Sequence, residues 1–296
     1  MSQSVIERLG LPALPDALPL PTVDAHTHLD STQTFSGLRV SDSLALAASV
    51  GVQRVVQIGC DLASAQWSAQ LAASNPQVVA AVAIHPNDAA RMTDEQASTA
   101  WCTIDGIAAS GTHIRAVGET GLDYFRTREP EGRARQQVMF RRHIDTAKRH
   151  DRTLVIHDRD AHDDIAEVLD SEGWPQRVVF HCFSGDADFA RRCLDHGAWL
   201  SFAGNVTYKA NQQLRDALSI TPRDRILAET DAPYLTPLPH RGKANAPYLL
   251  VHTVGFLAQH MGVELAEMCA QLASNTDEAF GGAWGVSQPN AGDLDA

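Results

Sequence analysis

Short apolar stretches alternate with amphipathic stretches along most of the chain. Several of the apolar stretches are rich in Val and Ile and lack polar alternation, as expected of strands that are buried on both faces. They predict eight strands, at residues 22–26, 54–58, 78–84, 114–117, 153–156, 177–180, 198–202 and 226–229.

The stretches that follow these strands have a pattern typical of helices. Examples lie at residues 41–50, 62–74, 134–149, 161–169, 186–196, 249–261 and 264–280. Eight strand–helix units predict an α/β protein with a (β/α)8 TIM barrel as a single domain. We expect the barrel at residues 22–281, a Pro-rich extended arm at 1–21, and a flexible tail of Gly, Asn and Asp at 282–296.

Composition fits one large folded domain. The chain has 296 residues, of which 44% are hydrophobic and 20% charged, and its net charge is -12. This acidity argues against a general affinity for nucleic acid, although a local basic patch remains compatible with a phosphodiester substrate. The five cysteines form no C-x-x-C pair, and neither a signal peptide nor a membrane-spanning apolar run is evident. We therefore expect a cytoplasmic enzyme with no membrane association and no obligate protein partner.

Residue types that bind metals fall at the carboxyl ends of the predicted strands. Six of them are candidate ligands: His26, His28, Glu119, His157, His181 and Asp231. In a TIM barrel these strand ends meet on one face, where barrel enzymes build their active sites. His26 and His28 are two residues apart, so they point to the same side of their strand.

Four imidazoles and two carboxylates suit divalent ions such as zinc, manganese or magnesium. Six ligands are too many for one tetrahedral ion with an open position, so we expect two ions with Glu119 placed to bridge them. Each residue alone has another interpretation. A single histidine at a strand end is more often a hydrogen-bonded core residue, and Glu119 or Asp231 alone is equally a helix cap or an ion-pair partner. Their combination on one barrel face favours the metal site.

Four further residues are candidate substrate contacts. His85 ends the third strand, and we assign it to the substrate rather than to a metal. Ser184 precedes a predicted helix at residue 186, whose free backbone N–H groups are expected to receive an oxyanion. Arg241 and Lys243 lie in a loop after the last strand and are expected to contact phosphate, although a solvated charge pair is the other interpretation. Cys182 is interpreted as a buried small residue rather than a thiolate nucleophile.

An ordered set of motifs resembles the TatD family of metal-dependent hydrolases, within the amidohydrolase superfamily. The set begins with Asp-Ala-His-Thr-His-Leu and continues to Arg-Gly-Lys. It occupies residues 24–29, 84–86, 118–124, 156–157, 180–185, 229–235 and 241–243. One H-x-H motif is weak evidence, but this order over nearly the whole chain is specific.

The resemblance implies a TIM barrel that holds two divalent metals and hydrolyses phosphodiesters as a deoxyribonuclease. One metal would be held by His26, His28, Glu119 and Asp231. The second would be held by Glu119, His157 and His181. By the same analogy Asp231 would orient or deprotonate the attacking water, and Glu229 would support the ligands.

Two departures from the family pattern concern substrate contacts rather than the metals. The family usually has Asn-Glu-Pro after Arg-Gly-Lys, whereas this chain has Asn245, Ala246 and Pro247. The helix after Tyr124 has His143 where the family usually has Gln. At the strand-four position where many amidohydrolases carry a carbamylated Lys, this chain has Glu119, which favours the TatD family.

These observations predict metal-dependent hydrolysis of phosphodiester bonds in DNA or a related substrate at the barrel mouth, with Asp231 and Glu119 as the catalytic residues. One alternative keeps the metals but changes the bond to an ester or amide, such as an aminoacyl ester on tRNA or a small cyclic amide. Another is a barrel that keeps the ligands and acts only as a binding partner.

Overall fold

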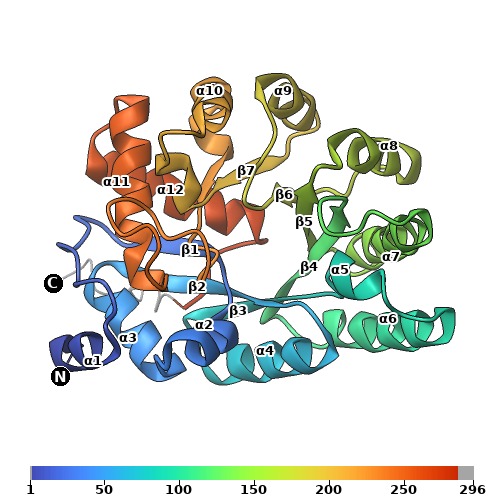
Figure 1. The fold of residues 1–296 in the computed structure, drawn as a ribbon, viewed down its shortest axis with the longest axis horizontal. Helices are drawn as coiled ribbons and strands as arrows, with labels where there is room; N and C mark the ends of the chain where they lie inside the picture. The colour runs from blue at the N-terminus through green and yellow to red at the C-terminus, as the bar shows by residue number, and fades with distance from the viewer. Residues whose placement is uncertain (1, 286–296) are drawn as a thin grey trace, which may run out of the picture.

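The eight predicted strands form one parallel sheet that curves into a barrel with helices around it (Figure 1). The computed structural model describes residues 2–285. Each strand pairs with its neighbour in sequence order. The strands are β1 Thr22–Thr27, β2 Val52–Gly59, β3 Val78–Val82, β4 Ile114–Asp123, β5 Thr153–Arg159, β6 Val178–Phe180, β7 Trp199–Phe202 and β8 Ile226–Ala228. The predicted α/β class and single TIM barrel are confirmed.

Every helix given as an example from the pattern is present, within four residues of its expected bounds. The α-helices are α1 Ser2–Leu9, α2 Leu29–Ser36, α3 Val40–Ser49, α4 Leu62–Ser74, α5 Pro86–Ala89, α6 Asp94–Ala108, α7 Pro130–Arg149, α8 His162–Glu172, α9 Ala187–Asp195, α10 Gln212–Ile220, α11 Leu250–Met261 and α12 Leu265–Ala279. Three 3-10 turns are η1 Gly204–Thr207, η2 Arg223–Arg225 and η3 Pro247–Leu249. In the described part of the chain, no helix has the length and apolarity needed to cross a membrane.

Two apolar cores account for the strand composition. The larger lies between the strands and the surrounding helices, and includes Phe140 and Tyr248. The smaller fills the lower barrel, with side chains from all eight strands and, from the segment after α12, Phe280 and Trp284. Most strands are therefore buried on both faces, which is why their sequences lack polar alternation.

The expected extended arm is partly helical. Helix α1 forms within it at residues 2–9, where the sequence is free of Pro and buries Ile6. From Leu11 onward the arm is irregular, because its prolines cannot continue a helix. It is held to the barrel by the Leu18 amide, which donates to the Val50 carbonyl at 3.0 Å, and by the Tyr248 hydroxyl, which donates to the Pro12 carbonyl at 2.6 Å.

The expected flexible tail begins as part of the fold. Trp284 is 8% exposed and closes the bottom of the barrel. Its indole nitrogen donates to the Gln77 carbonyl at 3.2 Å, and Arg54 lies 4.7 Å from its ring centroid. The composition predicted a loose segment because it combines Gly, Asn and Asp with little apolar content, but one buried indole anchors residues 282–285. The rest of the predicted tail lies outside the described residues.

A bulge in β1 sets the direction of the first two histidines. Between Asp24 and Thr27, β1 advances by three residues while β2 advances by two. Ala25 packs in the lower barrel core, so strict alternation would turn His26 away from the barrel axis. The extra residue brings His26 to the inner side instead.

A bulge in β4 sets the direction of Glu119 in the same way. Between Val117 and Thr120, β4 advances by three residues while β5 advances by two. Ala116 packs in the barrel core, and the bulge turns Glu119 to the same inner side. Two bulges therefore raise polar side chains above an apolar barrel floor.

The barrel closes between β8 and β1 through isolated hydrogen bonds. The Asp231 amide donates to the His26 carbonyl, and the His28 amide donates to the Ala232 carbonyl, both at 2.9 Å. The buried Asp24 carboxylate accepts from the Thr230 hydroxyl at 2.6 Å and from its amide at 2.9 Å. The first and last strands thus meet directly beneath the candidate ligands.

Candidate metal centre

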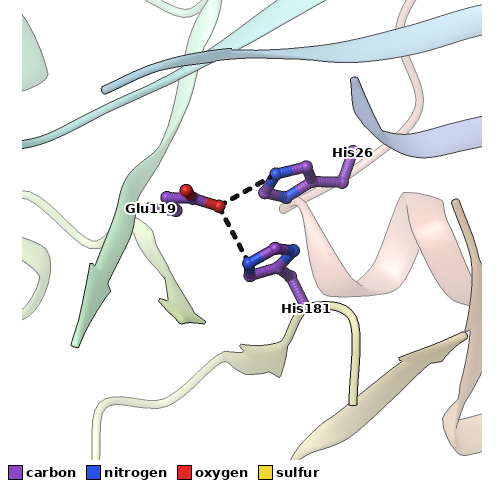
Figure 2. A group of neighbouring side chains, drawn as sticks. All are labelled: His26, Glu119 and His181. Atoms are coloured by element: carbon purple, nitrogen blue, oxygen red, sulfur yellow. Dashed lines mark ion pairs between the residues drawn. The ribbon is translucent and has the colours of Figure 1, made fainter. Parts of the chain in front are cut away.

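Glu119 stands at the centre of the converging side chains. Its Oε2 atom lies 2.8 Å from His181 Nε2 and 3.1 Å from His26 Nε2, and both rings point toward it (Figure 2). Its Oε1 atom lies 3.0 Å from His85 Nε2. The carboxylate therefore reaches imidazoles on both of its sides, as a bridging ligand would.

Asp231 completes one side of the cluster. Its Oδ1 atom lies 3.4 Å from His28 Nε2 and 3.8 Å from His26 Nε2. The Nε2 atoms of His26 and His28 are 3.3 Å apart. These three residues form a compact group at the closing point between β8 and β1.

His157 lies on the other side of the cluster. Its Nδ1 atom is 3.4 Å from His181 Nε2, and its Nε2 atom is 3.3 Å from Asp123 Oδ2. Together with Glu119 and His85 it forms another group whose donor atoms lie close together. His85, which we expected to contact substrate, is thus as close to Glu119 as the expected ligands are.

Asp123 belongs to the site although the sequence pattern did not select it. Its carboxylate accepts from the Asn87 side chain at 3.0 Å and from the Arg126 amide at 2.8 Å. Burial opposes its charge, but the contact with His157 and these hydrogen bonds outweigh burial and lower the pKa of Asp123. Strand β4 was expected to end at residue 117, because the polar residues after it hide its continuation.

Glu229 holds one of the histidines, as the resemblance implied. Its Oε1 atom lies 3.3 Å from His181 Nδ1 and accepts from the Cys182 amide at 2.8 Å, while its Oε2 atom accepts from the Ser201 hydroxyl at 2.5 Å. Glu229 is fully buried. A carboxylate on one imidazole nitrogen fixes the ring and directs the other nitrogen toward the cluster.

The donor set fits a divalent metal. Glu119 Oε2 and His157 Nε2 are buried and have no partner with hydrogen-bond geometry among the described residues, despite their close neighbours. Tetrahedral bonds of about 2.1 Å place two donors about 3.4 Å apart, close to the separations in this cluster. Nitrogen and carboxylate donors of this kind match zinc, manganese and related ions.

Glu119 and His181 stabilise each other's charged forms. Burial opposes ionisation of Glu119, but the His181 and His85 charges outweigh it, and the pKa of Glu119 falls well below its usual range. Burial likewise opposes protonation of His181, but Glu119 outweighs it and raises the pKa of His181 well above its usual range. Because metal ligands must be deprotonated, ion binding at these residues would release protons.

A cavity of about 680 Å³ opens above the cluster. Candidate ligands on its wall include His28, Glu119, His157, His181 and Asp231. His26 lies deeper, below the cavity wall, and is fully buried. The cavity is large enough for a substrate group to approach the cluster directly.

The N-terminus of α9, where we expected an oxyanion to bind, is capped from within the chain. Ser184 lines the cavity, but its hydroxyl donates to the Asp158 carbonyl at 2.9 Å. The Asp186 carboxylate accepts from the amides of Asp188 and Phe189 at 3.0 and 2.9 Å. The helix therefore caps its own N-terminus, and these two amides are not free for an external anion.

Arg241 and Lys243 are not among the residues that line the cavity. The Arg241 guanidinium is 4.4 Å from the ring centroid of Tyr208, and Lys243 is exposed. Two other cations, Arg126 and Arg159, line the cavity instead. The sequence offered one signal for them, because both follow the carboxyl ends of predicted strands.

Two cysteines also line the cavity. Burial, with added repulsion from nearby carboxylates, raises the pKa of the Cys182 thiol well above its usual range. The same causes raise the pKa of Cys60, whose Sγ atom lies 3.8 Å from Glu119 Oε1. Both remain thiols near neutral pH, in line with the interpretation of Cys182 as a small residue and not a nucleophile.

Comparison with known proteins identifies relatives over nearly the whole chain. The sequence profile of the family described as "TatD related DNase" matches residues 23–281. A Mycobacterium tuberculosis protein named "Uncharacterized metal-dependent hydrolase TatD" is 42% identical over 265 residues, which cover 88% of this chain and 98% of that protein. The Escherichia coli protein named "Uncharacterized metal-dependent hydrolase YcfH" is 34% identical over 260 residues, which cover 87% of this chain and 95% of that protein.

A solved structure has the same fold. The crystal structure of YjjV, a TatD homologue from Escherichia coli, superposes with a TM-score of 0.77 at 26% sequence identity. The superposition covers 88% of this chain and 98% of that chain.

Proposed function

This chain belongs to the TatD-related DNase family of metal-dependent hydrolases, and from that premise we propose that it hydrolyses phosphodiester bonds in DNA. The observation that carries the proposal is the convergence of imidazoles on both oxygens of Glu119 at the floor of an open cavity. A phosphodiester carries one negative charge shared by two non-bridging oxygens and has a poor leaving group, so its cleavage needs charge neutralisation and an activated water.

His26, His28, Glu119 and Asp231 would hold one ion, and Glu119, His157 and His181 would hold the second. When bound, the ions would supply Lewis-acid activation of water and neutralisation of phosphate charge. The residues of the chain supply the remaining parts of the reaction.

Asp231 is the residue placed to orient the attacking water and take its proton. Its side chain is 13% exposed at the cavity wall. Burial opposes its charge, but the hydrogen bond with His28 outweighs burial and lowers the pKa of Asp231, so the carboxylate is ionised before the reaction. Glu229 keeps His181 in one orientation throughout.

The test is metal content measured together with cleavage. Purified protein loaded with Zn²⁺, Mn²⁺ or Mg²⁺ is expected to cleave a labelled oligodeoxynucleotide. Asp231→Asn is expected to reduce kcat by about a hundredfold or more. Asp188→Asn removes an exposed carboxylate on α9 and serves as the matched control. Inactivity of all loaded forms on single- and double-stranded DNA would refute the proposal.

The ester or amide alternative has one specific support. Ala246 stands where the family usually has a loop carboxylate and is fully buried, so this loop supplies no carboxylate at that position. A panel containing DNA, aminoacyl esters and cyclic amides separates the two functions, because both use the same metals.

A further inference from the structure

Two arginines and a phenylalanine form a group at one edge of the cavity. Phe125 and Arg126 lie two and three residues after the end of β4, and Arg159 is the last residue of β5. The two strand ends are adjacent, since Asp123 pairs with Arg159 in the sheet and the Tyr124 amide donates to the Arg159 carbonyl at 2.9 Å. Arg126 and Arg159 line the cavity whose floor is the candidate metal cluster.

Both guanidinium groups lack an acidic partner within residues 2–285. The arginines that form ion pairs there lie at other places in the fold. Arg126 and Arg159 are two unpaired guanidinium groups that line the same cavity. Two of them in one cavity provide a site for an anion, because guanidinium binds phosphate through directed N–H groups.

The position of Arg159 on β5 places this anion site next to the candidate metal cluster. His157 and Arg159 are two residues apart on β5, so they share one face, about 6.6 Å apart along the strand. This spacing is similar to that between neighbouring phosphates of a polynucleotide. A phosphate at the cluster therefore places the next phosphate within reach of Arg159.

Phe125 adds an aromatic surface to the same edge. Its side chain is 48% exposed, and the Arg159 guanidinium lies 3.9 Å from its ring centroid. A large exposed aromatic ring with an arginine is the combination that proteins use to stack nucleobases while they neutralise the backbone. Tyr234, which is 55% exposed, lines the cavity from the loop after β8.

We propose that Phe125, Arg126 and Arg159 form a binding subsite for the nucleotide next to the cleaved phosphodiester. This proposal rests on the proposed function. The two arginines bind the neighbouring phosphate, and Phe125 stacks against the base of that nucleotide. The subsite gives the enzyme a preference for oligonucleotides over small phosphodiesters that have no second phosphate.

Steady-state kinetics on two substrates tests the subsite. Arg126→Ala with Arg159→Ala is expected to raise KM for a fluorescein-labelled oligothymidylate at least about tenfold. The same variant is expected to keep kcat and KM for bis(4-nitrophenyl) phosphate within twofold of the unchanged protein. Arg128→Ala, which removes an exposed arginine of the same loop, is the control for net charge. It is expected to leave kcat and KM unchanged for both substrates. An equal rise in KM for the oligothymidylate in Arg128→Ala and in the double variant would overturn the proposal.

Binding without turnover keeps this test separate from the proposed function. Fluorescence anisotropy of the same oligothymidylate, with protein in EDTA, is expected to show at least about tenfold weaker binding by the double variant. The slope of log Kd against log salt is expected to fall by about 0.7 for each lost phosphate contact. Phe125→Leu is expected to weaken binding without changing that slope, and Phe35→Leu, at another exposed ring, is its control.

If the protein cleaves no phosphodiester but the double variant loses binding, the proposed function fails and the subsite stands. If binding and slope are unchanged, the subsite is refuted.

Discussion

The pKa of Glu119 depends on the imidazoles around it. Its buried carboxylate has His181 and His26 on one oxygen and His85 on the other, so a change in those rings shifts the pKa of Glu119. A carboxylate whose two oxygens face separate imidazoles would serve as the bridge of the proposed two-ion site. The orientation of those rings is therefore as important for metal binding as the identity of the ligands.

Glu229 offers a way to test ring positioning alone. Glu229→Gln is expected to lower metal affinity about 10- to 100-fold, because the amide holds His181 Nδ1 less well than the carboxylate. Competition with a chromophoric chelator measures the change. Ser201→Ala removes only the donor to the other Glu229 oxygen and is expected to have a smaller effect. An equal effect of both variants would mean that Glu229 acts through general packing.

His143 predicts a pH dependence of stability. It is fully buried on α7, its Nδ1 atom lies 2.7 Å from the Thr120 hydroxyl, and burial lowers its pKa to about 3. The unfolded chain binds a proton near pH 6.5 while the folded chain does not, so this contribution to stability is present above pH 6.5 and is lost as the pH falls toward 3. Between pH 7.5 and 5.0 the loss is about 2 kcal/mol.

Replacement of His143 by Gln removes that titration. Urea unfolding of His143→Gln in EDTA is expected to show an acid-side loss of stability smaller by about 2 kcal/mol between pH 7.5 and 5.0 than in the unchanged protein. His150→Gln, at a partly exposed histidine of the same region, is the comparison. Parallel stability curves for the unchanged protein and His143→Gln would contradict the prediction.

At the scale of elements, the strands were predictable and the bulges were not. Val- and Ile-rich stretches mark strands because burial on both faces requires apolar side chains throughout. The direction of His26 depended on one extra residue in β1, which appears only when β1 is paired with β2. The convergence of the candidate ligands could be predicted from their residue types at strand ends, but the placement of Arg126 and Arg159 at one edge of the cavity needed the geometry of two adjacent strand ends.

The end of α12 and the residues that follow it, up to residue 285, close the bottom of the barrel, and their contribution to stability can be measured. Trp284→Ala is expected to destabilise the protein by about 3 kcal/mol, because it leaves a cavity at the barrel floor and removes the contact with Arg54. Guanidinium unfolding measures the loss. The cleavage rate per folded molecule is expected to remain unchanged, since the floor lies below the bulges. A loss of activity with no loss of stability would contradict this assignment.

At the scale of the molecule, the candidate ligands come from the ends of strands across the whole barrel, including both sides of its closure. Metal binding is therefore expected to stabilise the fold as a unit. At an ion concentration of about 100 times Kd the gain is about 2.7 kcal/mol. Differential scanning calorimetry is expected to show a rise of roughly 5 °C in Tm over protein in EDTA. His26→Ala with His28→Ala is expected to abolish most of this rise, and retention of the full rise would place the metal elsewhere.

The bulges of β1 and β4 give these strands two independent sets of positions. Below each bulge, Ala25 and Ala116 face inward as packing residues; above it, His26 and Glu119 face inward as chemical groups. A substitution in one set leaves the other set in place, because the change of side-chain direction separates them along the strand. The floor can be redesigned for heat resistance while the donors stay fixed, and the donors can be exchanged for a different ion while the floor stays fixed. The donor residues above the bulges can therefore be replaced without changing the packing of the barrel below them.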